Sequence, residues 1–328
     1  MMKIKAAQIA RDLGLSKATV SLALNDKPGV SEETKKMIFQ YIDRMEKGID
    51  IVENNIIKIV NYSKKENIYG GEVDLWSEVL SEFNKEAKKD GYSLGIDYIN
   101  DDIDEINKLI MECNQGHVVG AIVFANDLDE DIFKLFKQIK KPLIIYDNDF
   151  DDDNYSYVMI DNYQGMEKII KLIVEKGFNE VCYLANSHDN YNFRKRRMAF
   201  TDLISKYNLT GRIFITGNDV ESVYEAMKTE LVDKSFPKVL ISENYQVSIG
   251  TIKAIQEMNL SFKDDINLIG IDEIPDYFCY GHHLTALKII HGKRAGVALS
   301  LLKKEIEDHD VEKFKIYSTC RLIEGDTI

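Results

Sequence analysis

Short apolar runs alternate with helical patterns along most of the chain. From about residue 56, the strand-like runs include IIKIVNY, YSLGIDYI, VVGAIVFA, PLIIYDN, YVMID, EVCYLA, RIFIT, KVLIS and INLIGID. Between them, apolar positions recur at helical spacing in 73–90, 162–176, 193–207, 244–258 and 291–307. Sustained strand–helix alternation is typical of parallel sheets with helices on both faces. The sequence therefore predicts an α/β fold for the body of the chain.

The first 48 residues have a different pattern, with three short helices and no strand. The first predicted helix has an apolar face and ends at Gly14. Ser16 is a good N-cap for the second helix, and Ser31 caps a third helix after the break at Pro28-Gly29. Three short helices with a tight glycine turn between the first two describe a helix-turn-helix.

The polar side of the second predicted helix carries short donors. They suit phosphate oxygens and base edges, and they are Lys17, Thr19, Ser21 and Asn25. Taken alone, this pattern fits an ordinary amphipathic hairpin with a solvated face equally well.

Charge separates the same two parts of the chain. The whole chain has a formal net charge of -13, but residues 1–48 hold nine Lys/Arg and six Asp/Glu, a net of +3. A mildly basic head on an acidic body is expected when only the head meets a polyanion. The charge of the body serves solubility and keeps nucleic acid away from it.

Other features restrict the class of protein. The four cysteines are scattered without C-x-x-C spacing, which predicts neither a disulfide framework nor a zinc site. No signal-peptide pattern opens the chain and no 18-residue apolar run occurs, so we expect a cytoplasmic protein without a membrane partner. Because nucleotide-binding glycine motifs and catalytic groupings are absent, we expect neither an enzyme nor a bound cofactor. His282 and His283 could ligate a metal, but a surface or pocket-edge pair is the commoner arrangement.

The stretch AAQIARDLGLSKATVSLALNDKPGVSEETKKMI resembles the DNA-binding headpiece of the LacI/GalR family of bacterial repressors. The family pattern reads roughly I-x-D-V-A-x-x-A-G-V-S-x-x-T-V-S-R-V-L-N, followed by V-S-x-x-T-R. The resemblance implies that Lys17 and Ala18 face bases. It also implies phosphate contacts at Thr19, Ser21, Asn25, Ser31 and Thr34.

One departure in the headpiece affects base recognition. Leu22 stands where the family usually has an arginine that reads guanine. A leucine offers only apolar contact, for instance to a thymine methyl group. We therefore expect the operator to differ from the usual half-site of the family.

The segment after the headpiece departs further from the family pattern. Family members usually carry G-Y-x-P-N and an A-R-x-L hinge helix, which folds on the operator and wedges Leu between minor-groove bases. The corresponding stretch, MEKGIDIVENNIIKIV, lacks Pro and A-R-x-L and carries Glu46, Asp50 and Glu53. The negative potential of the minor groove repels such a segment. We expect an atypical linker at 49–55 that stays out of the groove.

The body also resembles this family. YVMIDNYQGM is similar to V-x-x-D-N-x-x-G, FRKRRMAF to R-x-x-G-F, ISENYQVSIGTIKAI to A-N-D-x-x-A-x-G, and LIGIDEIP to V-G-F-D-D-I-P. The resemblance implies a periplasmic-binding-protein-like core of two doubly wound parallel-sheet subdomains, with crossovers near 160, 288 and 319. The implied domains are the headpiece at 1–48, the linker at 49–55 and the core at 56–328. The N-subdomain is expected at about 56–160 and 289–318, and the C-subdomain at about 161–288 and 319–328.

Effectors of such a core are expected in the cleft where the carboxyl ends of strands converge. The positions that match the effector contacts of the family are Trp76, Asp147, Arg194, Arg196, Asn244 and Asp272. Asp, Arg and Asn suit polyhydroxylated ligands, since charged groups bind hydroxyls strongly. Trp76 fits stacking on a sugar or packing against the sheet, and the arginines fit ligand contact or a solvated helix face. Tyr245 and Ala199 replace the usual Asp and Gly, which leaves open an effector other than a typical free sugar.

Together these features predict a sequence-specific DNA-binding transcriptional regulator. We expect a homodimeric repressor of carbohydrate-utilisation genes that binds a double-stranded operator and a small-molecule effector, a sugar or sugar derivative. Control by a corepressor or a partner protein is the alternative within this class. A solute-binding or receptor core is the alternative from another class, and the headpiece argues against it.

Overall fold

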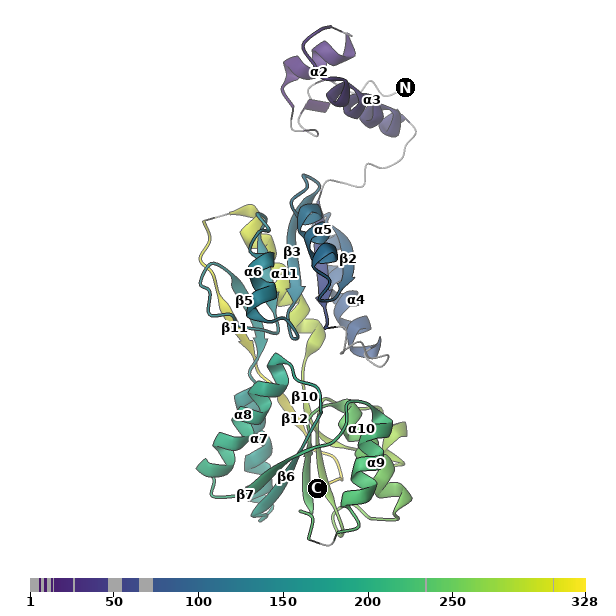
Figure 1. Cartoon of the computed structure of the whole chain (residues 1–328), viewed down its shortest axis with the longest axis vertical. Coiled ribbons are helices and arrows are strands. Elements are labelled where there is room, and N and C mark those ends of the chain that lie inside the picture. The colour runs from purple at the N-terminus through teal and green to yellow at the C-terminus, as the bar shows by residue number, and fades with distance from the viewer. Residues whose placement is uncertain are drawn as a thin grey trace.

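The computed structural model describes residues 6, 9–10, 13, 15–25, 27–46, 55–64, 73–233, 235–308 and 310–328 (Figure 1). The predicted linker lies outside these residues apart from Asn55, as do Asp50 and Glu53. What was expected of the linker therefore stays a prediction.

Two helices of the headpiece are described, α2 (Lys17–Leu24) and α3 (Glu32–Glu46). The N-cap predicted at Ser16 is confirmed, because its Oγ accepts a hydrogen bond from the Thr19 amide at 3.0 Å. Ser31 Oγ accepts from the Thr34 amide at 3.1 Å in the same way. The helices pack around a small core to which α2 contributes Val20 and Ala23.

The first sheet has six strands, all parallel, in the order β11-β5-β4-β3-β1-β2. Its strands are β1 (Ile56–Tyr62), β2 (Ser93–Ile99), β3 (Val118–Phe124), β4 (Leu143–Tyr146), β5 (Ser156–Ile160) and β11 (Lys315–Ser318). Side chains alternate between its faces, so Ile57 and Ile59 pack on one side while Val60 and Tyr62 pack on the other. One face is covered by α4 (Val73–Lys89) and α11 (His291–Glu307), the other by α5 (Ile103–Cys113) and α6 (Glu130–Phe136).

The second sheet repeats this arrangement in the order β12-β10-β9-β8-β6-β7, and only β12 runs antiparallel. Its strands are β6 (Glu180–Ala185), β7 (Thr210–Ile215), β8 (Val239–Ser242), β9 (Asn267–Ile271), β10 (Thr285–Lys288) and β12 (Arg321–Ile323). One face packs against α7 (Asn162–Glu175) and α8 (Tyr191–Lys206), the other against α9 (Val220–Glu230) and α10 (Tyr245–Glu257). The predicted fold class, a helical headpiece followed by two doubly wound sheets, is confirmed.

The chain passes between the two sheets three times. It leaves the first sheet after β5, returns from β10 into α11, and changes sheet again between β11 and β12. Figure 1 shows the two sheets stacked end to end, with these passages at their junction. None of the described helices combines the length and apolarity needed to cross a lipid bilayer.

Candidate functional site

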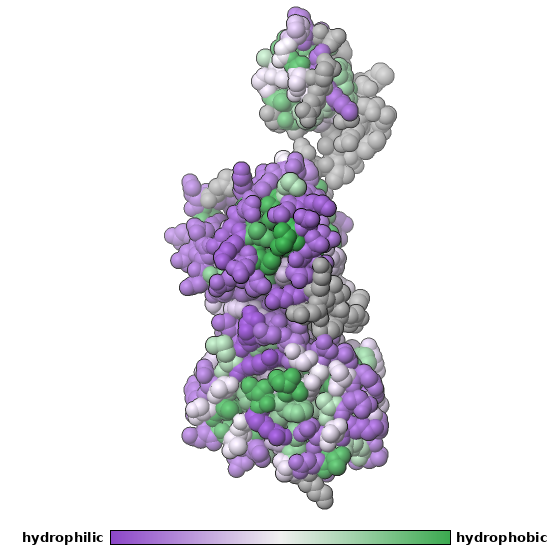
Figure 2. Space-filling model, in the orientation of Figure 1, coloured by the Kyte–Doolittle hydropathy of each residue, from purple (hydrophilic) through white to green (hydrophobic). Residues whose placement is uncertain are grey.

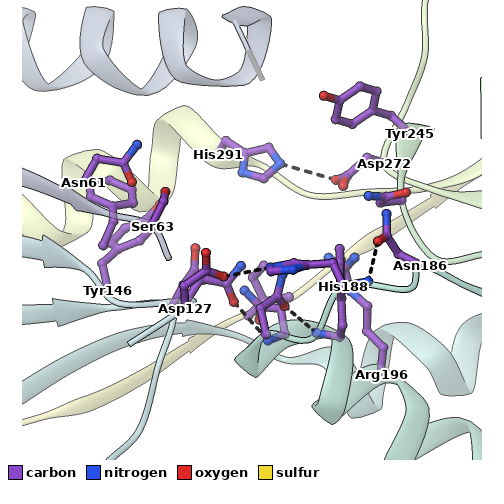
Figure 3. Close-up of a pocket in the computed structure, with 18 of the residues that line it drawn as sticks. Asn61, Ser63, Asp127, Tyr146, Asn186, His188, Arg196, Tyr245, Asp272 and His291 are labelled. Atoms are coloured by element: carbon purple, nitrogen blue, oxygen red, sulfur yellow. Dashed lines mark hydrogen bonds and ion pairs between the residues drawn. The ribbon is translucent and has the colours of Figure 1, made fainter. Parts of the chain in front are cut away.

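A cavity of about 180 Å³ lies between the two sheets. It is lined by residues that follow β1, β3 and β4 of the first sheet and β6, β8 and β9 of the second, where the carboxyl ends of parallel strands converge (Figure 3). One water molecule needs about 15 Å³ on this measure. The cavity therefore has room for a small organic molecule.

Four of the six predicted effector residues line the cavity, namely Asp147, Arg196, Asn244 and Asp272. Arg194 does not line it, since its exposed guanidinium donates from Nη1 to Asp189 at 2.9 Å. Trp76 belongs to α4, but its side chain lies outside the described part of the chain.

Arg196 is almost completely buried, with 5% of its surface exposed. Its Nε donates to Asn162 Oδ1 at 3.1 Å, and its Nη1 donates to the carbonyl oxygen of Glu243 at 2.7 Å. Both acceptors are neutral oxygens. The guanidinium is therefore fixed at the cavity wall and keeps its positive charge available to a ligand.

Asn244 caps a helix and also lines the cavity. Its Oδ1 caps α10 by accepting from the Val247 amide at 3.0 Å, and its Nδ2 donates to Gln246 Oε1 at 2.9 Å. The cap turns the first residues of α10 toward the cavity, so Tyr245 and Gln246 also line it.

Asp147 and Asp272 occupy equivalent places at the ends of β4 and β9, one in each sheet. Both have left-handed backbone, with φ of 61° and 73°. Strained conformations of this kind in non-glycine residues concentrate at functional sites. Each carboxylate is held by the first turn of α11, where Arg294 Nη2 contacts Asp147 Oδ1 and His291 Nε2 lies 3.3 Å from Asp272 Oδ1.

The charges around Asp272 keep its carboxyl group ionised. Burial opposes the charged form, but the hydrogen bond with His291 and the positive charges of Arg196 and Arg294 outweigh it and lower the pKa of Asp272. Asp272 therefore presents a hydrogen-bond acceptor to the cavity at neutral pH.

Among the described residues, three contacts join the loop after β3 to the loop after β6 and the start of α8. His188 Nε2 lies 3.2 Å from Asp127 Oδ1, and the amides of Tyr191 and Asn192 donate to the carbonyl and side-chain oxygens of Asn126 at 2.8 and 3.0 Å. Asp127, His188, Asn126 and Asn192 all line the cavity. A ligand bound there lies beside the contacts that hold the two sheets together.

The headpiece presents its predicted DNA-binding residues on one side. Lys17, Ala18, Ser21 and Asn25 are exposed at helical spacing on α2, while Val20 faces the core. The other predicted contacts are described as well: Ser31 is exposed, and Thr19, Leu22 and Thr34 are half-buried.

Comparisons with known proteins agree with this architecture. Residues 7–46 match the family described as "Bacterial regulatory proteins, lacI family", and residues 170–328 match a "Periplasmic binding protein-like domain". The chain belongs to the LacI family. Members of this family are transcriptional regulators, and this LacI-family chain is a DNA-binding transcriptional regulator with a periplasmic-binding-protein-like core.

Individual relatives resemble this LacI-family chain over nearly its whole length. The transcriptional repressor PurR of Actinobacillus pleuropneumoniae serotype 3 (strain JL03) is 22% identical over 302 residues, which are 91% of this chain and 90% of PurR. The lac repressor dimer bound to operator and the anti-inducer ONPF has a TM-score of 0.72 at 16% identity and 99% coverage of both chains. The transcriptional regulator CelR in complex with cellobiose has a TM-score of 0.70 at 14% identity, covering 99% of this chain and 100% of CelR.

Several residues of the LacI-family cleft were not predicted from the sequence. Asn126, Asp127, Asn186 and His188 follow the buried strands β3 and β6 directly, in the similar stretches FAND and LANSH. Polar residues at the carboxyl ends of two parallel strands are a signal that could have identified them. His291 has a weaker signal, since it begins a helix and its partner lies 19 positions away.

Proposed function

We propose that this LacI-family regulator is a repressor of carbohydrate-utilisation genes whose effector is a small polyhydroxylated molecule bound in the cleft. The observation that carries the proposal is the convergence of Arg196, Asn244 and Asp272 on one cavity between the sheets. Asp272 accepts from ligand hydroxyls and Arg196 donates to ligand oxygens, and both bonds are charge-assisted. The similarity to the CelR–cellobiose complex supports a sugar or sugar derivative.

The lining as a whole suits a sugar-like ligand. Among the described residues of the lining, seven side chains are amides of Asn or Gln, which both donate and accept hydrogen bonds. Val79, Phe124 and Phe193 add apolar surface for the carbon-bound faces of a ring. Because the lining comes from both sheets, a ligand that contacts both favours one relative orientation of the two halves.

In this proposal the headpiece reads the operator in the major groove. Lys17, Ala18 and Leu22 contact bases, and the phosphate contacts come from Thr19, Ser21, Asn25, Ser31 and Thr34. The domain limits are 1–48 for the headpiece, 49–55 for a linker that stays out of the minor groove, and 56–328 for the core. The protein acts in the cytoplasm, where it meets DNA.

We propose that two copies pair so that their headpieces read the two halves of a pseudo-palindromic operator. Exposed apolar side chains on edge strands of both sheets support pairing, among them Ile96 and Tyr98 on β2 and Ile213 and Ile215 on β7. Figure 2 shows apolar patches on each half of the core within a largely hydrophilic face.

The effector assignment is tested by thermal unfolding of the full-length protein with a panel of sugars and sugar derivatives. A ligand present at 100 times its Kd stabilises the folded state by about 2.7 kcal/mol and raises Tm. We expect Asp272→Ala to lose this rise, because the variant removes the buried acceptor. Glu273→Ala changes the exposed neighbouring carboxylate and keeps the rise. An undiminished rise in the Asp272→Ala variant places the effector elsewhere.

A further inference from the structure

The guanidinium of Arg294 has hydrogen-bonding capacity that the protein leaves unused. Its side chain is 2% exposed and contacts Asp147 through Nη2. Within the described part of the chain, its buried Nε and Nη1 have no hydrogen-bond partner. The Cζ atom of Arg294 lies 4.5 Å from the centre of the Tyr146 ring. The buried hydroxyl of Tyr146 likewise has no hydrogen-bond partner among the described residues. Orphaned buried donors are rare in native structures and call for an explanation.

The unused donors of Arg294 and Tyr146 lie close to the cleft. Tyr146 and Asp147 line the cavity, and Arg294 lies directly behind them. Arg294 is three residues after His291, a lining residue on the same face of the first turn of α11. A ligand that fills the cavity therefore contacts Tyr146 and Asp147, the two residues that Arg294 itself contacts.

Each of three carboxylates that line the cleft already has a histidine or arginine partner. Arg294 contacts Asp147, His291 contacts Asp272, and His188 contacts Asp127. Arg196, on the opposite wall, donates only to neutral oxygens among its described partners. Arg196 at the cleft wall and Arg294 behind it are thus both buried with donors to spare, and a ligand must bring acceptor oxygens to satisfy them.

We propose that the effector carries an acid group, a carboxylate or a phosphate, whose oxygens bind at Arg294 and Tyr146. The inference rests on the proposed function, because it takes the cleft as the effector site and specifies the chemistry of its ligand. One guanidinium can serve Asp147 and a ligand anion together, since its five N–H groups point in several directions in one plane. The amide-rich remainder of the lining serves the hydroxyl groups of the same ligand.

The test compares matched ligands by isothermal titration calorimetry on the full-length protein. Each aldohexose in a panel is compared with its own hexuronate and its own 6-phosphate. We expect one of the two acids to bind at least about tenfold more tightly than the neutral sugar, as charge-assisted hydrogen bonds require. The acid that binds identifies the anion as a carboxylate or a phosphate.

Arg294→Met should lower the affinity for the acid by about 10- to 100-fold and leave affinity for the neutral sugar nearly unchanged. Lys293→Met, at the exposed neighbouring position, should change neither affinity. Because Arg294→Met leaves the Asp147 carboxylate without its partner, the charge-balanced variant Asp147→Asn/Arg294→Met is measured as well. A merely structural role for Arg294 would lower both affinities together.

Two results overturn the inference: neutral sugars that bind as tightly as both acids, or a preference for the acid that persists in Asp147→Asn/Arg294→Met. If neutral sugars bind and Asp272→Ala abolishes their binding, the cleft remains the effector site and only the acid group is wrong. If no member of the panel binds and none alters operator affinity, the proposed sugar effector fails together with the inference.

Discussion

Glu243 has no exposed side-chain surface, yet it lies at the centre of a network of polar contacts. Its two carboxylate oxygens accept from Arg197 Nε and Nη2, both at 2.7 Å, and also from the Tyr183 hydroxyl and the Asn186 amide. Its carbonyl oxygen accepts from Arg196. Burial raises the pKa of Glu243 more than Arg197 lowers it. The network therefore fixes the geometry of the cleft rather than adding much net stability.

Removing the central member of this network should lower the free energy of unfolding, even though the intact network adds little net stability. We expect Glu243→Ala to lower the free energy of unfolding by about 3 kcal/mol, because it leaves a partly buried arginine and two other donors without an acceptor. Urea denaturation measures the change. Asp131→Ala, which removes a solvent-exposed ion pair with Lys134, serves as the control and should leave the midpoint unchanged. Equal midpoints for the two variants would contradict the prediction, because they would show that removing Glu243 leaves no costly unpaired donor.

Among single residues, the sequence predicted those cleft residues that lie in recognisable motifs and missed those defined by tertiary contacts. Asp147, Asn244 and Asp272 each follow or begin an element whose pattern could be read locally, and Arg196 lies within the predicted helix α8. Arg294 could not be found in this way. Its partner Asp147 is 147 positions away, and an arginine in an amphipathic helix gives no local sign that it is buried.

At the scale of elements, the long and strongly patterned segments were predicted well. The five predicted helices correspond to α4, α7, α8, α10 and α11, and the strand-like runs correspond to β1 to β9. The elements left unpredicted are shorter or have a weaker apolar pattern. For example, α6 has only seven residues, and β11 alternates exposed and half-buried positions because it lies at the edge of its sheet. Such edge strands lack the continuous apolar run of a central parallel strand.

Helix α2 is the element on which operator binding is expected to depend. We expect Lys17→Ala/Asn25→Ala to abolish specific binding, since both side chains are exposed on the polar face of this helix. Asn25 Nδ2 also donates to the Ser21 carbonyl at 2.7 Å, so circular dichroism must first establish that the headpiece stays folded. Fluorescence anisotropy with labelled operator then measures the affinity at several salt concentrations.

The matched control is Lys176→Ala, which removes one positive charge from an exposed site at the end of α7. It should leave both operator affinity and its salt dependence unchanged, because the acidic core is expected to stay away from DNA. Specific binding that survives in Lys17→Ala/Asn25→Ala, or in a chain without residues 1–48, would contradict the assignment of α2.

For the whole molecule, the decisive feature is that the effector cleft and the contacts between its two walls share the same residues. Asp127 and His188 line the cavity and also meet each other across it at 3.2 Å. We therefore expect closure of the cleft around a ligand to keep this contact and opening of the cleft to break it. A contact made in only one of two conformations shifts their populations by its own free energy.

A double-mutant cycle on this contact tests the link between closure and effector binding. We expect Asp127→Ala and His188→Ala each to weaken effector binding, and the double variant to bind no more weakly than the worse single variant. The coupling energy should be about 1 kcal/mol, as for one partly buried hydrogen bond.

The second measurement is the distance between labels at Lys134 on α6 and Met198 on α8, both exposed and in different halves. The ligand-free variants should show a larger distance than the wild type, because the wild type keeps the contact that closes the cleft. Strictly additive losses, or an unchanged label distance, would mean that the two residues act on the ligand separately and that closure does not depend on their contact.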